Sequence, residues 1–155
     1  MRKTISVIGS AGCSAQELET AYEVGRGIGE NGAVLICGGL GGVMESAAKG
    51  AKEFGALTIG ILPGADKSIA NPYIDIPILT TFGEARNVIV ALSADALIAI
   101  GGSLGTLSEL AFAMKRKKPV IGIKTWDLDK IYCDKVNIIS VSNAQEAIEQ
   151  AFSFA

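Results

Sequence analysis

The chain has 155 residues, of which 49% are hydrophobic and 19% are charged, and its formal net charge at pH 7 is −2. This length suits one domain with its own core, and the composition excludes an intrinsically disordered chain. No window reaches the roughly 18 uninterrupted apolar residues of a membrane-spanning helix, and no long basic run indicates a nucleic-acid partner. Since the first residues lead directly into a short strand pattern, with no secretory signal, we expect a cytoplasmic protein.

The first half of the chain alternates apolar strands with amphipathic helices. We predict strands at residues 3–8, 33–39 and 56–64, and helices at residues 15–31 and 43–54. Ser14 and Glu17 have the spacing of a capping box at the start of the first helix, and Asn31-Gly32 is typical of its end.

The second half continues the same alternation after a polar stretch at residues 65–73, which predicts a surface loop. The segment at residues 74–79 resumes a buried strand pattern. Further strands are predicted at residues 95–102, 119–123 and 137–141, helices at 83–93, 107–115 and 144–154, and a loop around Trp126. No domain boundary or internal repeat stands out in residues 1–155. The pattern predicts a single α/β domain, a three-layer α/β/α Rossmann-like open sheet that is mainly parallel.

Three predicted strands end in glycine-bearing turns. Glycine lets backbone N–H groups approach a ligand closely, and the start of the following helix adds unpaired donors and partial positive charge. Each turn alone could serve tight packing only, but three turns at one sheet edge favour a site for a phosphate-bearing ligand. This glycine cradle comprises Gly9, Ser10, Gly38, Gly39, Gly42, Gly101, Gly102, Ser103, Leu104, Gly105 and Thr106. Neither the dinucleotide fingerprint nor a Walker motif is present.

Two charged residues near the cradle are candidates for chemistry. Glu109 lies about one turn into its helix and could bond a ribose hydroxyl, steady a cationic transition state, or simply favour the helix N-terminus. Arg86 opens a helix, where its charge is unfavourable, so it is either an anion clamp or a solvated side chain. Glu45 has the same two interpretations as Glu109, with a first-turn helix acid favoured.

The chain has no histidine, which excludes Ser-His-Asp, Cys-His and histidine-base chemistry. The three cysteines, Cys13, Cys37 and Cys133, are widely spaced and odd in number, so we predict neither a disulfide framework nor a metal site. The short basic cluster at residues 116–118 lies near a predicted helix end, where it complements the helix dipole.

These stretches together resemble the LOG-like family of the SLOG superfamily, long labelled "possible lysine decarboxylase". Its motif P-G-G-x-G-T-x-x-E is matched by Gly102, Gly105, Thr106 and Glu109, its loop G-G-x-x-G-x-M by Gly38, Gly39, Gly42 and Met44, and its helix arginine by Arg86. The chain departs from the family pattern at Gly101, Ser103 and Asn87, which replace proline, glycine and lysine, and it lacks the neighbouring histidine. It resembles most the short branch that includes molybdenum-cofactor-carrier-like proteins.

The resemblance implies a protein that binds a nucleotide or a phosphate-bearing pterin, such as a molybdopterin-type ligand, with no other cofactor required. The alternative is a nucleoside 5′-monophosphate phosphoribohydrolase, in which the family assigns Glu109 to stabilising ribosyl cation character and Arg86 to positioning Glu109. A structural or interaction protein with a vestigial site is a third possibility. A pyridoxal phosphate lysine decarboxylase finds no support, because no lysine stands at an obvious cofactor motif.

We also expect self-association as a homodimer or homotetramer. The helices near 83–93 and 107–115 carry wide apolar faces, which include Val88, Ile89, Leu92, Leu110, Phe112, Ala113 and Met114. The family resemblance supports this expectation further.

Overall fold

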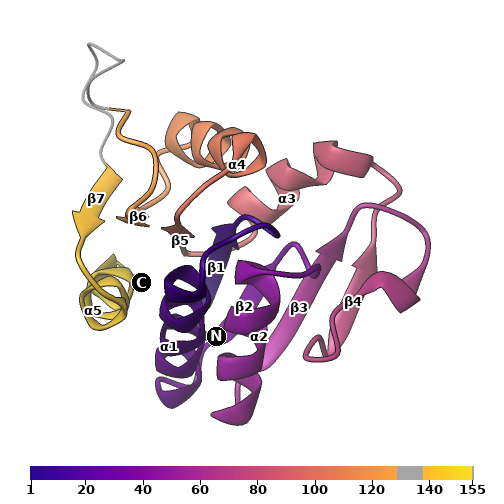
Figure 1. Cartoon of the computed structure of the whole chain (residues 1–155), viewed down its shortest axis with the longest axis horizontal. Coiled ribbons are helices and arrows are strands. Elements are labelled where there is room, and N and C mark those ends of the chain that lie inside the picture. Colours follow the sequence, from indigo (N-terminus) through magenta and orange to yellow (C-terminus); the bar gives the residue numbers. More distant parts are fainter. Residues whose placement is uncertain (129–137, 155) are drawn as a thin grey trace.

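Seven parallel strands form one sheet in a computed structural model that describes residues 1–128 and 138–154 (Figure 1). The strands are β1 (Thr4–Gly9), β2 (Val34–Cys37), β3 (Leu57–Leu62), β4 (Ile76–Leu79), β5 (Ala96–Ile100), β6 (Val120–Ile123) and β7 (Ile138–Val141). Their order across the sheet is β4-β3-β2-β1-β5-β6-β7, and every neighbouring pair is parallel. The predicted three-layer Rossmann-like fold is confirmed.

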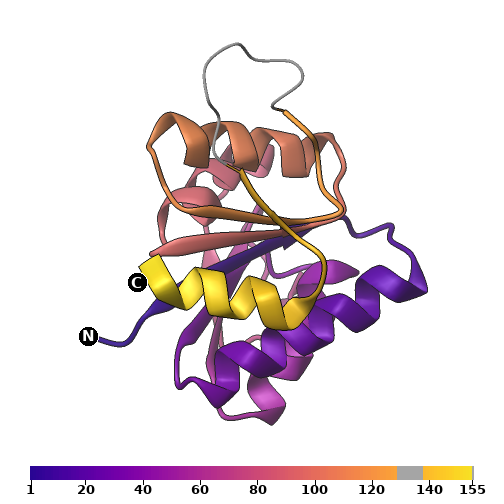
Figure 2. The same cartoon turned by 90° about the vertical axis from the view of Figure 1, so that its left-hand side faces the viewer.

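Helices cover both faces of the sheet (Figures 1 and 2). One layer holds α1 (Ala15–Glu30), α2 (Val43–Glu53) and α5 (Ala144–Phe154). The opposite layer holds the short 3-10 helix η2 (Gly83–Arg86), which continues into α3 (Asn87–Leu92), and α4 (Leu104–Lys115). The remaining 3-10 turn, η1 (Lys67–Ile69), lies in the predicted surface loop. The central strands are buried on both faces, which explains their continuous apolar runs.

The chain reverses its winding direction beside β1. It builds β1 to β4 outward in one direction, then crosses back so that β5 pairs with the other side of β1. Gly9 lies opposite Ile100 in this pairing, so β1 and β5 end at the same level. A reversal of this kind leaves a crevice outside the carboxyl ends of the strands, where ligands bind in open α/β sheets.

Close contact between α1 and α2 depends on glycine. A Cβ at Gly25 would collide with the backbone carbonyl of Ala47, and one at Gly50 would collide with that of Tyr22. These two positions bring the backbones together, and since α1 follows β1 and α2 follows β2, both helices begin at the carboxyl edge of the sheet.

The structure corrects three sequence predictions about the elements. Residues 83–93 form two short pieces, η2 and α3, rather than one helix. Helix α4 begins at Leu104, three residues earlier than predicted. Strand β4 was expected to be buried, yet Ile76, Ile78 and Leu79 are half exposed, because β4 is an outer strand with a neighbour on one side only. None of the described helices is both long and apolar enough to cross a bilayer.

Candidate ligand-binding site

The three glycine turns follow β1, β2 and β5, which are neighbours in the sheet. The structure therefore gathers the predicted cradle residues at one edge, although the third turn lies about 60 residues beyond the second in sequence. The first two turns touch directly, because the Val43 N–H donates to the Ser10 carbonyl at 3.1 Å.

Gly42 makes that contact possible. Its φ of 65° is rarely adopted by other residues, and a Cβ there would collide with the Ser10 carbonyl and lie 2.5 Å from the Ala11 carbonyl oxygen. Gly9 is similarly confined, since its Cβ would lie 2.5 Å from Cγ1 of Val43. In these two turns glycine serves close packing between backbones as well as access for a ligand.

Arg86 lies against the second turn and is only 8% exposed. Its Nη2 donates to the Gly38 carbonyl at 3.4 Å, and its Nη1 donates to Oδ1 of Asn87 at 2.6 Å. A Cβ at Gly38 would lie 2.9 Å from both Nη atoms. Burial lowers the pKa of Arg86, but the group remains a cation at any physiological pH. Its Nε finds no hydrogen-bond partner among the described residues.

Glu109 is the counterion of Arg86. Its Oε1 lies 3.9 Å from Nη1 of Arg86, and the residue is 6% exposed. Burial raises the pKa of Glu109 to about 7, and the guanidinium opposes that shift only partly. The carboxyl group therefore exchanges its proton near neutral pH, whereas an exposed glutamate is ionised there.

A hydrogen-bond chain joins the second and third turns. It runs from the Gly38 carbonyl through Arg86 to Asn87, whose Nδ2 donates to Oγ of Ser108 at 3.1 Å. The Ser108 hydroxyl in turn donates to the Gly105 carbonyl at 2.7 Å. Sequence reasoning registered Asn87 only as a departure from the family motif and missed Ser108, because no local pattern reveals that these two side chains meet.

The third turn begins α4 and is held by Trp126. The Ser103 N–H donates to Oγ1 of buried Thr106 at 3.3 Å, and Nε1 of Trp126 donates to the Ser103 carbonyl at 3.2 Å. The indole also lies against Gly102, where a Cβ would be 3.0 Å from two of its ring atoms. Leu104 is 77% exposed at the start of the helix. The sequence predicted a loop around Trp126 but gave no sign of this contact.

The structure also locates the predicted helix caps, Glu45 and two of the cysteines. The capping box of Ser14 and Glu17 is present, and the side chain of Asn143 caps the start of α5. Glu45 lies in the first turn of α2. Cys37 is buried with its thiol pKa raised to about 12, and Cys13 is half-buried, while Cys133 lies outside the described residues. Among the described residues, no group of three or more acidic or cysteine side chains could hold a metal ion.

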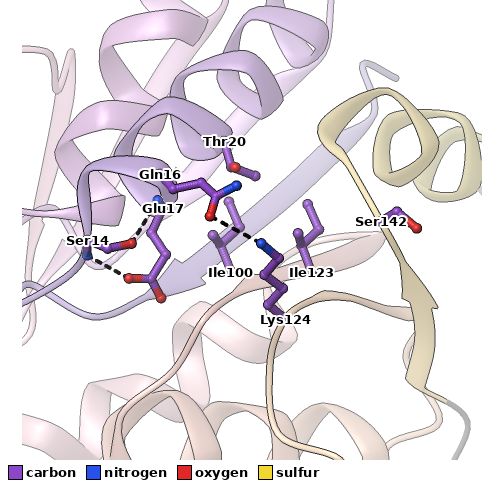
Figure 3. Close-up of a pocket in the computed structure, with 8 residues that line it drawn as sticks. All are labelled: Ser14, Gln16, Glu17, Thr20, Ile100, Ile123, Lys124 and Ser142. Carbon is purple, nitrogen blue, oxygen red and sulfur yellow. Dashed lines mark hydrogen bonds between the residues drawn. The ribbon is translucent and has the colours of Figure 1, made fainter.

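A cavity of about 280 Å³ lies beside the cradle, on the α1 side of the sheet (Figure 3). Its floor contains Ile100 and Ile123, the last residues of β5 and β6, and its rim contains polar side chains such as Gln16, Glu17 and Lys124. Sequence reasoning did not identify this cavity, since four separate segments line it.

The sequence model of the SLOG cluster4 family matches residues 2–152. The molybdenum cofactor binding protein of Rippkaea orientalis has a similar structure, with a TM-score of 0.92 and 40% identity over 99% of this chain and 97% of that one. The molybdenum cofactor carrier protein of Chlamydomonas reinhardtii gives a TM-score of 0.86 and 36% identity over 99% and 98% of the two chains.

A more distant relative is an enzyme. The cytokinin riboside 5′-monophosphate phosphoribohydrolase of Mycobacterium tuberculosis is 32% identical over 122 residues, which make up 72% of this chain and 65% of that protein. The chain thus spans slightly less than two thirds of this relative.

Proposed function

Since the chain belongs to the SLOG cluster4 family, we propose that it binds a phosphate-bearing pterin of the molybdenum-cofactor type in its glycine cradle. Similarity to two proteins described as binding or carrying the molybdenum cofactor, over nearly the whole chain, supports this proposal. The observation that carries it is that three glycine turns end neighbouring strands at one sheet edge, with a buried arginine against the second turn, since a phosphate needs convergent N–H donors and positive charge.

The residues of the cradle suit a phosphate group. The third turn supplies backbone N–H groups at the start of a twelve-residue helix, whose dipole favours an anion. Arg86 adds a full positive charge behind the second turn. The pterin and its metal are cargo in this proposal, so the chain's own residues bind and shield the ligand without changing it.

Gly105 offers a sharp test of phosphate binding. A Cβ at this position would meet only ordinary contacts, 3.6 Å to Oγ of Ser103 and 3.8 Å to Nδ2 of Asn87. Gly105→Asp therefore places a negative charge at the third turn with little steric effect, and Gly105→Asn is its uncharged control. Two like charges about 4 Å apart repel by roughly 1 kcal/mol or more, so we expect Gly105→Asp to bind at least about fivefold more weakly than Gly105→Asn.

Binding is measured by native mass spectrometry and by thermal shift with a molybdopterin-type ligand and with nucleoside monophosphates. Stabilisation by the pterin, absent in Gly105→Asp, supports the proposal. If only nucleotides stabilise the protein, its ligand is a nucleotide and not a pterin. If no phosphate-bearing ligand binds, or if the Asp and Asn variants bind equally, the proposal is wrong.

A second candidate function is phosphoribohydrolase activity, which the Arg86–Glu109 pair favours. An arginine within 3.9 Å of a buried acid beside the cradle is the arrangement that the LOG-like resemblance assigns to ribosyl cation stabilisation. The raised pKa of Glu109 limits its negative charge at pH 7, which weakens this role. Release of free base from a panel of nucleoside monophosphates tests it, with Glu109→Gln as the control. Equal inactivity of both proteins would exclude the enzyme.

A further inference from the structure

The cavity beside the cradle has an apolar floor and a polar rim (Figure 3). The floor side chains, Ile100 and Ile123, are almost completely buried. At the rim, Nζ of Lys124 donates to Oε1 of Gln16 at 3.2 Å. With a volume of about 280 Å³, the cavity lies just below the usual range for whole ligands, which suits one part of a larger ligand.

The cavity and the third glycine turn share a wall. A Cβ at Gly101 would collide with the Glu17 carboxylate, which therefore occupies the space beside the turn. The other oxygen of that carboxylate accepts from the Ser14 N–H at 2.7 Å, so the capping box fixes the position of Glu17. Glu17 therefore stands between the third turn and the cavity, and a ligand held by its phosphate at the third turn would reach the cavity past the Glu17 carboxylate.

Lys124 occupies a backbone conformation that lysine rarely adopts. Its φ is 48°, in the left-handed region, directly after the end of β6. Non-glycine residues are strained in this region. Here the conformation places the Lys124 ammonium at the rim of the cavity (Figure 3).

We propose that this cavity binds an amino-oxo heterocycle, a pterin or a guanine, that belongs to the ligand whose phosphate occupies the glycine cradle. This inference rests on the proposed function. The Glu17 carboxylate suits the N–H and amino donors of such a ring. The Lys124 ammonium and the Gln16 amide suit the ring carbonyl.

The chain offers a matched pair of variants for this test. Lys124→Asn removes the charge, and asparagine tolerates a positive φ. Lys117 is also exposed, has a φ of 55° and follows the C-terminal end of α4, near the opposite edge of the sheet, so Lys117→Asn is the control. A second pair acts through volume: Thr20→Phe fills the cavity, whereas Thr20→Val keeps its size.

The probes separate the ring from the phosphate. Neopterin monophosphate and GMP carry the amino-oxo edge, AMP carries a different edge, and ribose 5-phosphate has no ring. Titration calorimetry on the folded variants, checked by thermal melting, gives the affinities. We expect one of the first two probes to bind the unchanged protein at least about tenfold more tightly than AMP or ribose 5-phosphate. Lys124→Asn and Thr20→Phe should remove this preference, while Lys117→Asn and Thr20→Val retain it.

Ribose 5-phosphate binding distinguishes a failure of this inference from a failure of the proposed function. If ribose 5-phosphate binds the cradle while the cavity variants leave the ring preference unchanged, or if no preference exists, this inference is wrong and the proposed function stands. If none of the four probes and no molybdopterin-type ligand binds, both are wrong.

Discussion

At the scale of single residues, burial changes the chemistry of Glu109. The same side chain on the surface would be ionised at neutral pH, but here desolvation outweighs the attraction of Arg86 and raises its pKa to about 7. The sequence shows that an acid stands at this position of the motif. Its burial in the folded protein sets the pH at which it loses its proton.

This shift predicts how stability depends on pH. Between about pH 4.5 and 7 the folded protein holds a proton on Glu109 that the unfolded chain has released, so the free energy of unfolding falls as pH rises. The loss amounts to about 3 kcal/mol for a shift of this size. No histidine titrates in the same interval, which makes the effect visible. Urea denaturation from pH 5 to 8 measures it.

The control for this effect is Glu109→Gln, which cannot ionise. Its free energy of unfolding should stay nearly constant where that of the unchanged protein declines. Parallel profiles for the two proteins would mean that the buried carboxyl group is not shifted.

Gly42 predicts a steric effect at a single Cβ. Gly42→Ala must accommodate a positive φ and collide with the first turn, whereas Gly32→Ala has nearly the same φ of 67° and nothing within 4 Å. Because Gly42 also has a ψ of −130°, a backbone combination that other residues rarely adopt, and meets the first turn, we expect Gly42→Ala to lose about 1–3 kcal/mol more unfolding free energy than Gly32→Ala. Chemical denaturation of both proteins compares them, and equal losses would show that the turns do not pack as described.

At the scale of elements, the first turn of α1 both stabilises the helix and borders the cavity. The Ser14 side chain accepts from the Glu17 N–H at 3.2 Å, while Glu17 accepts from the Ser14 N–H. The same two residues border the cavity beside the third glycine turn. A cap recognised from sequence as a helix signal therefore also fixes the wall between the cradle and the cavity.

Removing this cap should weaken the whole fold modestly. Ser14→Ala leaves a helix N–H without its partner, and we expect a loss of about 1 kcal/mol in unfolding free energy. Ser153, which bonds the carbonyl of Gln150 in the last turn of α5, provides the control, and Ser153→Ala should change stability by less than about 0.5 kcal/mol. Thermal and urea unfolding of both variants measure these losses. A Ser14→Ala variant with the same free energy of unfolding as the unchanged protein would contradict the capping role.

Elements were predictable where one helix or strand had a clear local pattern. The capping box of Ser14 and Glu17, the central apolar strands and the glycine turns follow directly from residue spacing. Strand β4 and the 83–93 segment were harder, because an edge position and a break between η2 and α3 depend on neighbours rather than on hydrophobic spacing.

At the scale of the whole molecule, part of the apolar surface of α4 remains uncovered. Leu110 and Ala113, which the sequence placed on a possible dimer face, are buried against the sheet, whereas Phe112 is 41% exposed. Exposed Leu104 on the same helix adds to this surface. We keep the prediction of a dimer or tetramer, with the outer face of α4 as the contact.

Sedimentation velocity tests this prediction. Phe112→Asp should shift the protein toward the monomer, because an ionised side chain cannot be buried in an apolar contact without a partner. Phe154→Asp, at a 52% exposed position at the end of α5, should leave the assembly unchanged. A monomeric unchanged protein, or an equal effect of both substitutions, would place the contact elsewhere or exclude it.

The sequence by itself determined the alternation of strands and helices, the three glycine turns and the candidate pair Arg86 and Glu109, because these depend on local spacing and residue chemistry. Only the tertiary structure decided that β1, β2 and β5 are neighbours, that Asn87 and Ser108 connect two turns, and that a cavity opens beside Gly101. Those features arise from segments far apart in the chain, so they follow from how the sheet is ordered and packed and leave no local signal in the sequence.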